Sequence, residues 1–580
     1  MAAFKTDEKK AKFLTRMLEI HKQVRLPYED MVDNIIRFVD HSWRPIKVSP
    51  HQKGKNTGID VYDGTALAAA NLAADGIHGY MCSSNIHWFD YTLPGRMNFP
   101  RTSGMRSWTG KRMDEYPEVK IWLDECEEVA YAAFLRSNFY EWHPGFVKEG
   151  ITTGTPTAII EEDLEKGRIV FKLPHFRECY VAENYFGVVD TLYREYKLTL
   201  KKLVQKFGEK QVFSLGHDLK NQYDRDPYVE KDCLHAIFPR TDYDPTKVNS
   251  KNKPVASIYM LLDGAKGKIL GEGGYDEIPT VTWRWRKNND EIYGRTPAWD
   301  AYVDIAMANQ MGKTNLIASH KMVDPPMVGP EDLRGKVNNA PNGWTWIQGQ
   351  VTKDKMPLPL STGIQIPFSV DMQDRVDKAI KEHFHVDFFL MLYQAAFNKV
   401  DLTATQVIGM QGEQAAVLGT RIGRHQSEAL NPIMDRVFNI EVKAGRMPEP
   451  PQILQDSSGA SIETDYVGPL SQAQKRLFKT QSIRGGLELA TQIAQVFQTS
   501  VDMVDGDAVM KEALESVNFP SNALRSPEMV KQIRDIRAQE AKAAKDLEAI
   551  EGMSKAAQKM SKTTEPGSPL DALTGEQGAG

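Results

Sequence analysis

The stretch DEIYGRTPAWDAYVDIAMANQMGKTNLIASHKMVDPPMVGP, residues 290–330, predicts one long helix. Thr296 is a good N-cap, and Pro297 suits the first helical position because its missing N–H would have no helical partner there. Nothing interrupts the pattern before two consecutive prolines that begin at Pro325. Because the residue before a proline avoids the α region, we expect the helix to end near Val323, after about 40 Å.

The centre of this predicted helix lacks an apolar stripe. Between Asn309 and Asn315 the only large apolar side chain is Met311, which lies beside Gln310 and Lys313. A helix that packs into the core of a single chain carries an apolar stripe along its whole length. The sequence therefore indicates a long helix that is not buried along its whole length in the core of a single chain.

The composition is that of an ordinary globular protein. The chain has 580 residues, of which 41% are hydrophobic and 26% are charged, and this length allows several domains and a large core. Its formal net charge is -5, so no overall basic character indicates tight nucleic-acid binding. The charged N-terminal sequence and the lack of any run of about 18 apolar residues predict a cytosolic protein without membrane insertion.

The order of the patterns predicts an α+β protein that is mainly α. The N-terminal quarter shows helical periodicity, whereas the sequence from Gly150 contains short β-favouring runs separated by turn residues, which is typical of an antiparallel sheet. A second long helix should begin with Ser369 as its N-cap and continue to Asn398, over about 43 Å. The proline-rich segment between the two helices contains β-like pieces, so we expect an antiparallel helix pair with a small module at its far end.

A search for catalytic and metal-binding patterns predicts none. The tripeptide Gly312-Lys313-Thr314 ends a nucleotide-binding loop motif, but Met307 stands where that motif needs glycine, and a helical backbone has no free N–H groups for phosphates. His383, His385 and Asp387 alternate along a predicted helix, where residues two apart point in different directions. Four widely spaced cysteines are expected to be buried thiols: Cys82, Cys126, Cys179 and Cys233. We expect no catalytic, cofactor or metal site.

Basic residues leave two interpretations open. Lys313 lies in the polar centre of the first helix, and Lys399, Arg421 and Arg424 flank a segment that Gly409 and Gly412 should loosen. These cations are either ordinary exposed surface or sparse phosphate contacts, which would be weak and sensitive to salt.

Several longer motifs occur in a fixed order along the chain: VYDGTALAAANLAADGIHGYM (61–81), HWFDYTLP (87–94), TGTPTAIIEE (153–162), FKLPHFRECYVAENYFGVVDTLYREYKLTLKKLVQKFG (171–208), IPTVTWRWRKNNDEIYGRTPAWDAYVDIAMANQM (278–311), HKMVDPPMVGP (320–330) and DLTATQVIGMQGEQAAVLG (401–419). Each motif alone would be weak evidence. Together, from about residue 10 to about residue 520, they resemble the head-to-tail connector, or portal, proteins of short-tailed bacteriophages.

The resemblance implies a portal fold assembled as a ring, generally of twelve subunits, with a central channel. Its regions would be the wing (1–295, a helical part and an antiparallel β part), first stem helix (296–323), clip (324–368), second stem helix (369–398), tunnel-loop segment (399–414), wing return helix and connection (415–470), crown and possible barrel helices (471–562) and flexible tail (563–580). Such a ring lies at one capsid vertex, conducts DNA during packaging and ejection, and docks the packaging motor and then the tail.

The implied partners are a homo-oligomer, double-stranded DNA, the packaging terminase, a tail adaptor, and capsid and scaffolding proteins. The implied location is the head-tail junction of the virion, after assembly in the host cytoplasm. Two alternatives stay open: another ring-forming virion protein such as a tail adaptor, and, from a different class, a DNA-packaging enzyme. The missing glycine at position 307 speaks against the enzyme.

The resemblance also suggests contact residues. Four residues are expected near the DNA channel: Lys313, Lys399, Gln411 and Gln414. Five charged clip residues are expected to dock the motor or the tail: Glu331, Arg334, Lys336, Lys353 and Lys355. In a ring each helix has neighbours on both flanks and water in the channel, which would explain the polar centre. Small side chains would let adjacent helices approach closely: Ala301, Ala306, Ala308, Gly312 and Ala318.

Overall fold

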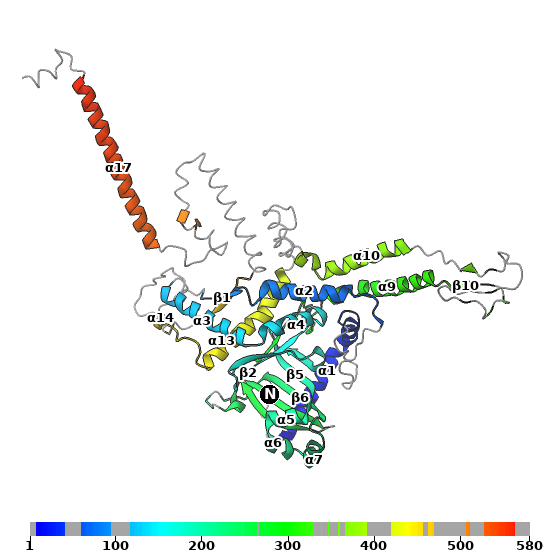
Figure 1. Ribbon diagram of the computed structural model, residues 1–580. Helices are drawn as coiled ribbons and strands as arrows, with labels where there is room; N and C mark the ends of the chain where they lie inside the picture. Colours follow the sequence, from blue (N-terminus) through cyan, green and yellow to red (C-terminus); the bar gives the residue numbers. More distant parts are fainter. Residues whose placement is uncertain are drawn as a thin grey trace, which may run out of the picture. The chain divides into compact units, whose positions relative to one another are not determined.

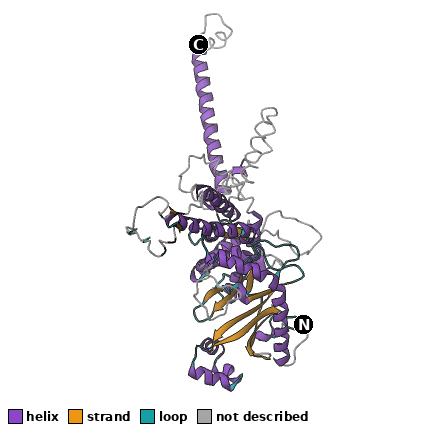
Figure 2. Cartoon of the chain, turned by 90° about the vertical axis from the view of Figure 1, so that its right-hand side faces the viewer, coloured by secondary structure: helices purple, strands orange, loops and turns teal. Residues whose placement is uncertain are grey.

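The computed structural model divides the chain into two units, residues 1–477 and 478–580 (Figures 1 and 2). The residues that it describes are 7–40, 60–93, 116–329 without 245, 248, 264 and 265, then 331, 334, 338, 346, 356, 358–359, 366–390, 419–455, 462–468, 506–507, 509–510 and 527–562.

Helices surround the largest apolar core of the first unit. They are α1 (Asp7–Phe38), α2 (Thr65–Met81), α3 (Pro117–Arg136), α4 (Phe139–Thr152) and α13 (Asn431–Lys443). Trp88, Phe134 and Phe139 are fully buried at its centre, and the rings of Trp88 and Phe139 stack with centroids 5.8 Å apart. Alanines recur on one face of α2 at helical spacing and are buried, so this helix can approach α4 closely.

A five-stranded antiparallel sheet forms the β part, in the order β4-β5-β6-β7-β8. Its strands are β4 (Cys179–Glu183), β5 (Val189–Thr199), β6 (Glu230–Pro239), β7 (Val255–Asp263) and β8 (Lys266–Tyr275). Alternate side chains of β6 enter different cores: Leu234 and Ala236 pack with α1, whereas Cys233 packs with α5 (Leu200–Phe207) and α6 (Glu209–Ser214). Helices therefore cover both faces of the sheet, and α7 (His217–Arg225) follows α6.

Smaller strand groups join distant parts of the chain. The sheet β3-β2-β9 contains β2 (Thr157–Asp163), β3 (Arg168–Lys172) and β9 (Thr280–Thr282). A two-stranded ladder pairs β1 (Phe89–Thr92) with β12 (Glu463–Tyr466). Two 3-10 turns, η4 (Phe176–Glu178) and η5 (Ser250–Asn252), and the short helix α14 (Gln452–Gln455) complete the connections.

Arg284 ties three of these parts together. The residue is 3% exposed, and its guanidinium forms ion pairs with Glu183 at the end of β4 and with Glu428 in the π-helical turn η8 (Gln426–Leu430). The Arg284–Glu428 pair is 2.7 Å long, and the same side chain donates to the carbonyl of Gly187 at 3.0 Å. Removing either partner would leave a poorly solvated charge, so this contact fixes the β4–β5 turn against the helical core.

The predicted mixture of helix and strand is confirmed, and all four cysteines are buried and free. α13 ends at Lys443, and Gly445 has a φ of 68°, which favours glycine after a helix. In the second unit, the Ala-, Lys- and Glu-rich sequence forms the helix α17 (Pro527–Lys562). No helix in the described ranges has the length and apolarity needed to span a membrane.

We predict that Gly150→Ala lowers stability by about 1–3 kcal/mol, because a new methyl group would overpack the core. An added Cβ would lie 2.3 Å from the ring of Trp283, which is 1% exposed and held by its neighbours. Thermal unfolding of the full chain measures the loss. Gly79→Ala on α2 is the control, since nothing lies within 4 Å of its Cβ position. Equal melting temperatures for Gly150→Ala and the wild type would contradict the packing described.

Candidate functional site

The first long helix begins and ends as predicted but is interrupted once. Thr296 accepts a hydrogen bond from the Trp299 N–H at 2.9 Å and caps α8 (Pro297–Asp300), and α9 (Tyr302–Val323) follows. Ala301 between them has a ψ of 0°. In such a tightened turn residues three apart lie on the same side, and both Ala298 and Ala301 are fully buried. The expectation of one uninterrupted helix was therefore wrong at Ala301.

The second helix starts earlier than predicted and is interrupted once. α10 (Ile366–His383) starts before Ser369, which is therefore not its N-cap, because Pro367 is tolerated in a first helical turn. It is interrupted after His383, since His385 has a φ of 56°, and residues 386–390 are helical again. Four apolar side chains at and beyond this break are buried: Phe384, Val386, Phe388 and Phe389. Residues 391–398 lie outside the described residues.

The two helices form the expected antiparallel pair (Figure 1). Asn315 donates to the side chain of Gln373 at 2.7 Å, and three turns away Asp304 lies 3.4 Å from His383. Between these contacts four apolar side chains of the two helices join the main core: Ile305, Ala308, Val376 and Ile380. Beyond the pair, β10 (Met327–Val328) pairs with β11 (Leu358–Pro359), and most of the connection between them lies outside the described residues.

The polar centre of α9 has partners within its own chain. Asn309 accepts a hydrogen bond from the Tyr62 N–H at 2.7 Å and donates to the Asp60 carbonyl at 3.3 Å. An added Cβ on Gly312 would lie 3.0 Å from the Tyr62 carbonyl oxygen, and the Lys313 ammonium lies 5.7 Å from the Tyr62 ring. A segment before α2 therefore lies across this part of α9. Water in a channel is not needed to explain Asn309, and Gly312 makes room for the chain's own backbone.

One face of α9 carries exposed apolar side chains. Val303 is 69% exposed, Met307 42% and Ile317 46%, and helical spacing places the three on one side, opposite the buried Ile305 and Ala308. We call Val303, Met307 and Ile317 the apolar stripe. Beyond Ile317 the only buried side chain of α9 is Ala318, so this end of the helix packs on little besides α10.

The expected contact residues are only partly described. Lys313 is exposed, and Glu331 and Arg334 form an exposed ion pair of 3.2 Å. Six others lie outside the described residues, and their roles stay predictions: Lys399, Gln411, Gln414, Lys336, Lys353 and Lys355.

The base of the helix pair rests on a buried group of aromatic and histidine side chains. An added Cβ on Gly76 of α2 would lie 2.5 Å from the Phe389 ring, so the chain after α10 packs directly on that helix. The His425 ring packs against Trp283 with centroids 4.5 Å apart and against His143 at 5.3 Å, and His143 and His78 approach to 3.0 Å between Nδ1 atoms. No sequence pattern predicts this group, because its members come from five segments that are far apart in the chain.

Burial keeps these histidines neutral. It lowers the pKa of His425 to about 3, and neither ring nitrogen of that side chain has a hydrogen-bond partner within the described part of the chain. Burial, together with the nearby Arg421, lowers the pKa of His385 to about 4. The imidazole rings of His425 and His385 are therefore uncharged at neutral pH.

His383, His385 and Asp387 do not form a metal site. His383 approaches Asp304, His385 contacts Arg421, and the Asp387 side chain is exposed. In the described ranges, the side chains that do bring three ligand atoms together are His87, Asp90 and Glu127, all within 4.8 Å of one another. Sequence reasoning missed this group because Glu127 lies on α3, far from the other two.

We predict that the protein loses stability as pH falls below about 6.5, and that His425→Leu loses less. An unfolded histidine takes up a proton near pH 6.5, whereas the folded His425 stays neutral down to about pH 3. The unfolded state is therefore favoured at lower pH, by about 2 kcal/mol per such histidine at pH 5. Melting temperatures at pH 7 and pH 5 measure the effect, with the exposed His320→Gln as control. An unchanged pH dependence in His425→Leu would contradict a neutral, buried ring.

Comparison with known proteins supplies independent information. The sequence model of the family described as "Bacteriophage head to tail connecting protein" matches residues 11–524. The "Portal protein" of Salmonella phage epsilon15 is 28% identical over 581 residues, which covers 99% of each chain. The "Probable portal protein" of Bordetella phage BPP-1 is 26% identical over 506 residues, which covers 86% of this chain and 85% of the relative.

Proposed function

The chain belongs to the family of bacteriophage head to tail connecting proteins, and we propose that it works as a portal ring at one capsid vertex. The portal function follows from its relatives, which are named as portal proteins and align with most or all of the chain. The ring would be the conduit for DNA during packaging and ejection. It would dock the packaging motor first and the tail adaptor afterwards, at the head-tail junction of the virion.

The observation that carries the ring is the apolar stripe of α9. A helix pair is too thin to bury both faces of each helix, and here the face opposite the core leaves Val303, Met307 and Ile317 in water. A neighbouring copy can cover such a face, and rotation about an axis repeats the contact until the ring closes. The family resemblance suggests twelve copies. In this assembly α8, α9 and α10 would be the stem, and residues 324–368 the clip.

The charge balance suits a passage for DNA. A formal net charge of -5 gives the protein no excess of cations that would hold phosphates tightly, and a conduit must let the duplex slide. We assign the channel contacts to Lys313, Lys399, Gln411 and Gln414. Clip charges, beginning with the exposed pair Glu331 and Arg334, would meet the motor and the tail. The energy for packaging would come from a separate terminase.

We predict that the double substitution Val303→Asp and Met307→Asp prevents ring formation. Each new carboxylate would be buried without a partner in every subunit contact, and an unpaired buried charge costs several kcal/mol. The fraction of chains in rings should fall by at least about tenfold, as measured by mass photometry at matched concentration. Ser319→Asp is the control, because it adds a charge at an exposed position of the same helix that lies away from the stripe. Normal rings from the double variant would contradict an interface at the stripe.

We further predict that charge reversal at Lys399 impairs DNA handling without affecting assembly. If this residue lies at the channel, Lys399→Glu places a ring of carboxylates beside the phosphates, which repels the duplex. Rings should form normally, while the amount of DNA packaged or retained falls severalfold in a packaging assay. Lys321→Glu, at the exposed end of α9, controls for loss of a positive charge elsewhere on the stem. Unchanged packaging and retention in Lys399→Glu would exclude this residue from the channel.

A further inference from the structure

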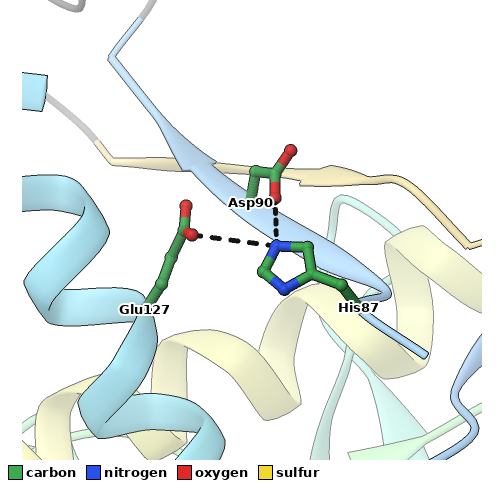
Figure 3. A group of neighbouring side chains, drawn as sticks. All are labelled: His87, Asp90 and Glu127. Atoms are coloured by element: carbon green, nitrogen blue, oxygen red, sulfur yellow. Dashed lines mark hydrogen bonds and ion pairs between the residues drawn. The ribbon is translucent and has the colours of Figure 1, made fainter. Parts of the chain in front are cut away.

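His87, Asp90 and Glu127 lie together, with the two carboxylates directed at the His87 ring (Figure 3). His87 lies two residues before the start of β1, Asp90 is on β1, and Glu127 is on α3. The Nε2 atom of His87 is 2.5 Å from Asp90 Oδ1 and 3.8 Å from Glu127 Oε2. Both carboxylates thus approach the same ring nitrogen, which is the atom that a metal ion would use.

The backbone and neighbouring side chains hold these groups in place. Glu127 accepts a hydrogen bond from the Tyr91 N–H through Oε1 at 2.7 Å, which leaves Oε2 directed at His87. Tyr131, one turn further along α3, accepts hydrogen bonds from the N–H groups of Trp88 and Phe89 at 2.7 and 3.1 Å. Its ring also stacks on the imidazole of His87, with centroids 4.9 Å apart. The orientations of His87 and Glu127 are therefore set before any ion arrives, as in metal sites with supporting contacts.

The local charge favours a cation. In the part of the chain that the structure describes, neither Asp90 nor Glu127 forms an ion pair with a lysine or an arginine. Asp465 on β12 lies directly opposite Asp90 in the ladder, and facing like charges on neighbouring strands destabilise a sheet. The Glu127 side chain is only 13% exposed, so its charge is poorly solvated. A divalent ion would offset these unfavourable contacts.

We propose that His87, Asp90 and Glu127 form a binding site for a divalent transition-metal ion such as Zn²⁺. One imidazole nitrogen and two carboxylate oxygens are ligands that zinc accepts, and in a tetrahedral site they would lie about 3.4 Å apart. The present separations require only small side-chain rotations to reach that arrangement. The His87 side chain is 55% exposed, so solvent can supply the fourth ligand. The ion would join β1 to α3 and thereby stiffen this part of the fold, independently of the proposed portal role.

The test uses the untagged full-length protein after treatment with a chelator. Titration calorimetry with Zn²⁺ should show about one ion bound per chain, and Zn²⁺ should raise the melting temperature. His87→Ala and Asp90→Asn each remove a ligand and should weaken binding by at least about 100-fold, because even loss of a supporting contact costs 10- to 100-fold. Binding of Co²⁺ gives a second readout, since its visible absorption reports nitrogen and oxygen ligation and should disappear in His87→Ala.

Two control variants separate coordination from general attraction. Asp124→Asn removes an exposed carboxylate near the cluster that is not one of the three ligands, and His320→Ala removes an exposed histidine of α9. Both should bind Zn²⁺ within about threefold of the wild type. Melting curves in chelator show whether each variant is folded before metal is added. Absence of stoichiometric Zn²⁺ binding to the wild type, or equal binding by folded His87→Ala, would overturn the proposal. The three residues would then form only an ion pair between a histidine and carboxylates.

Discussion

Two packed helices cannot bury both of their faces, and this limit governs the organisation of the molecule. α9 packs on the core through Ile305 and Ala308 and on α10 through Asn315, yet its opposite face keeps Val303, Met307 and Ile317 in water. Such a face is stable in solution when another surface covers it. A ring of identical copies covers it with no additional protein, and a closed ring of paired helices necessarily encloses a passage.

In the proposed ring, the helix pair would keep its position only if its base were rigid. Phe389 packs onto α2 at Gly76, and Trp283 fills the space that Gly150 leaves on α4. Arg284 then joins the strand region to the turn before α13 through paired and nearly buried charges. Each of these contacts connects segments more than 100 residues apart in sequence. These contacts join distant segments into one packed body, and the helix pair extends from it.

The sequence predicted those features that depend on local chemistry. Thr296 and Val323 mark the helix ends because capping and the following prolines act within a few residues, and the buried cysteines follow from their apolar surroundings. Ser369 was misjudged because Pro367 also fits a first turn. The interruption after α10 depends on how Phe384 and its neighbours pack into the core. No short sequence pattern encodes that packing. For the same reason the partner of Asn309 and the meeting of His87 with Glu127 could not be foreseen: both depend on tertiary packing between distant segments.

The most direct test of the whole account is electron microscopy of the purified full-length protein, viewed along the particle axis and reconstructed to side-chain detail. The account predicts closed rings with a central passage, in which the apolar stripe of each α9 packs against the neighbouring copy. Chains that stay single at micromolar concentration, or rings in which Val303, Met307 and Ile317 face solvent, would contradict it.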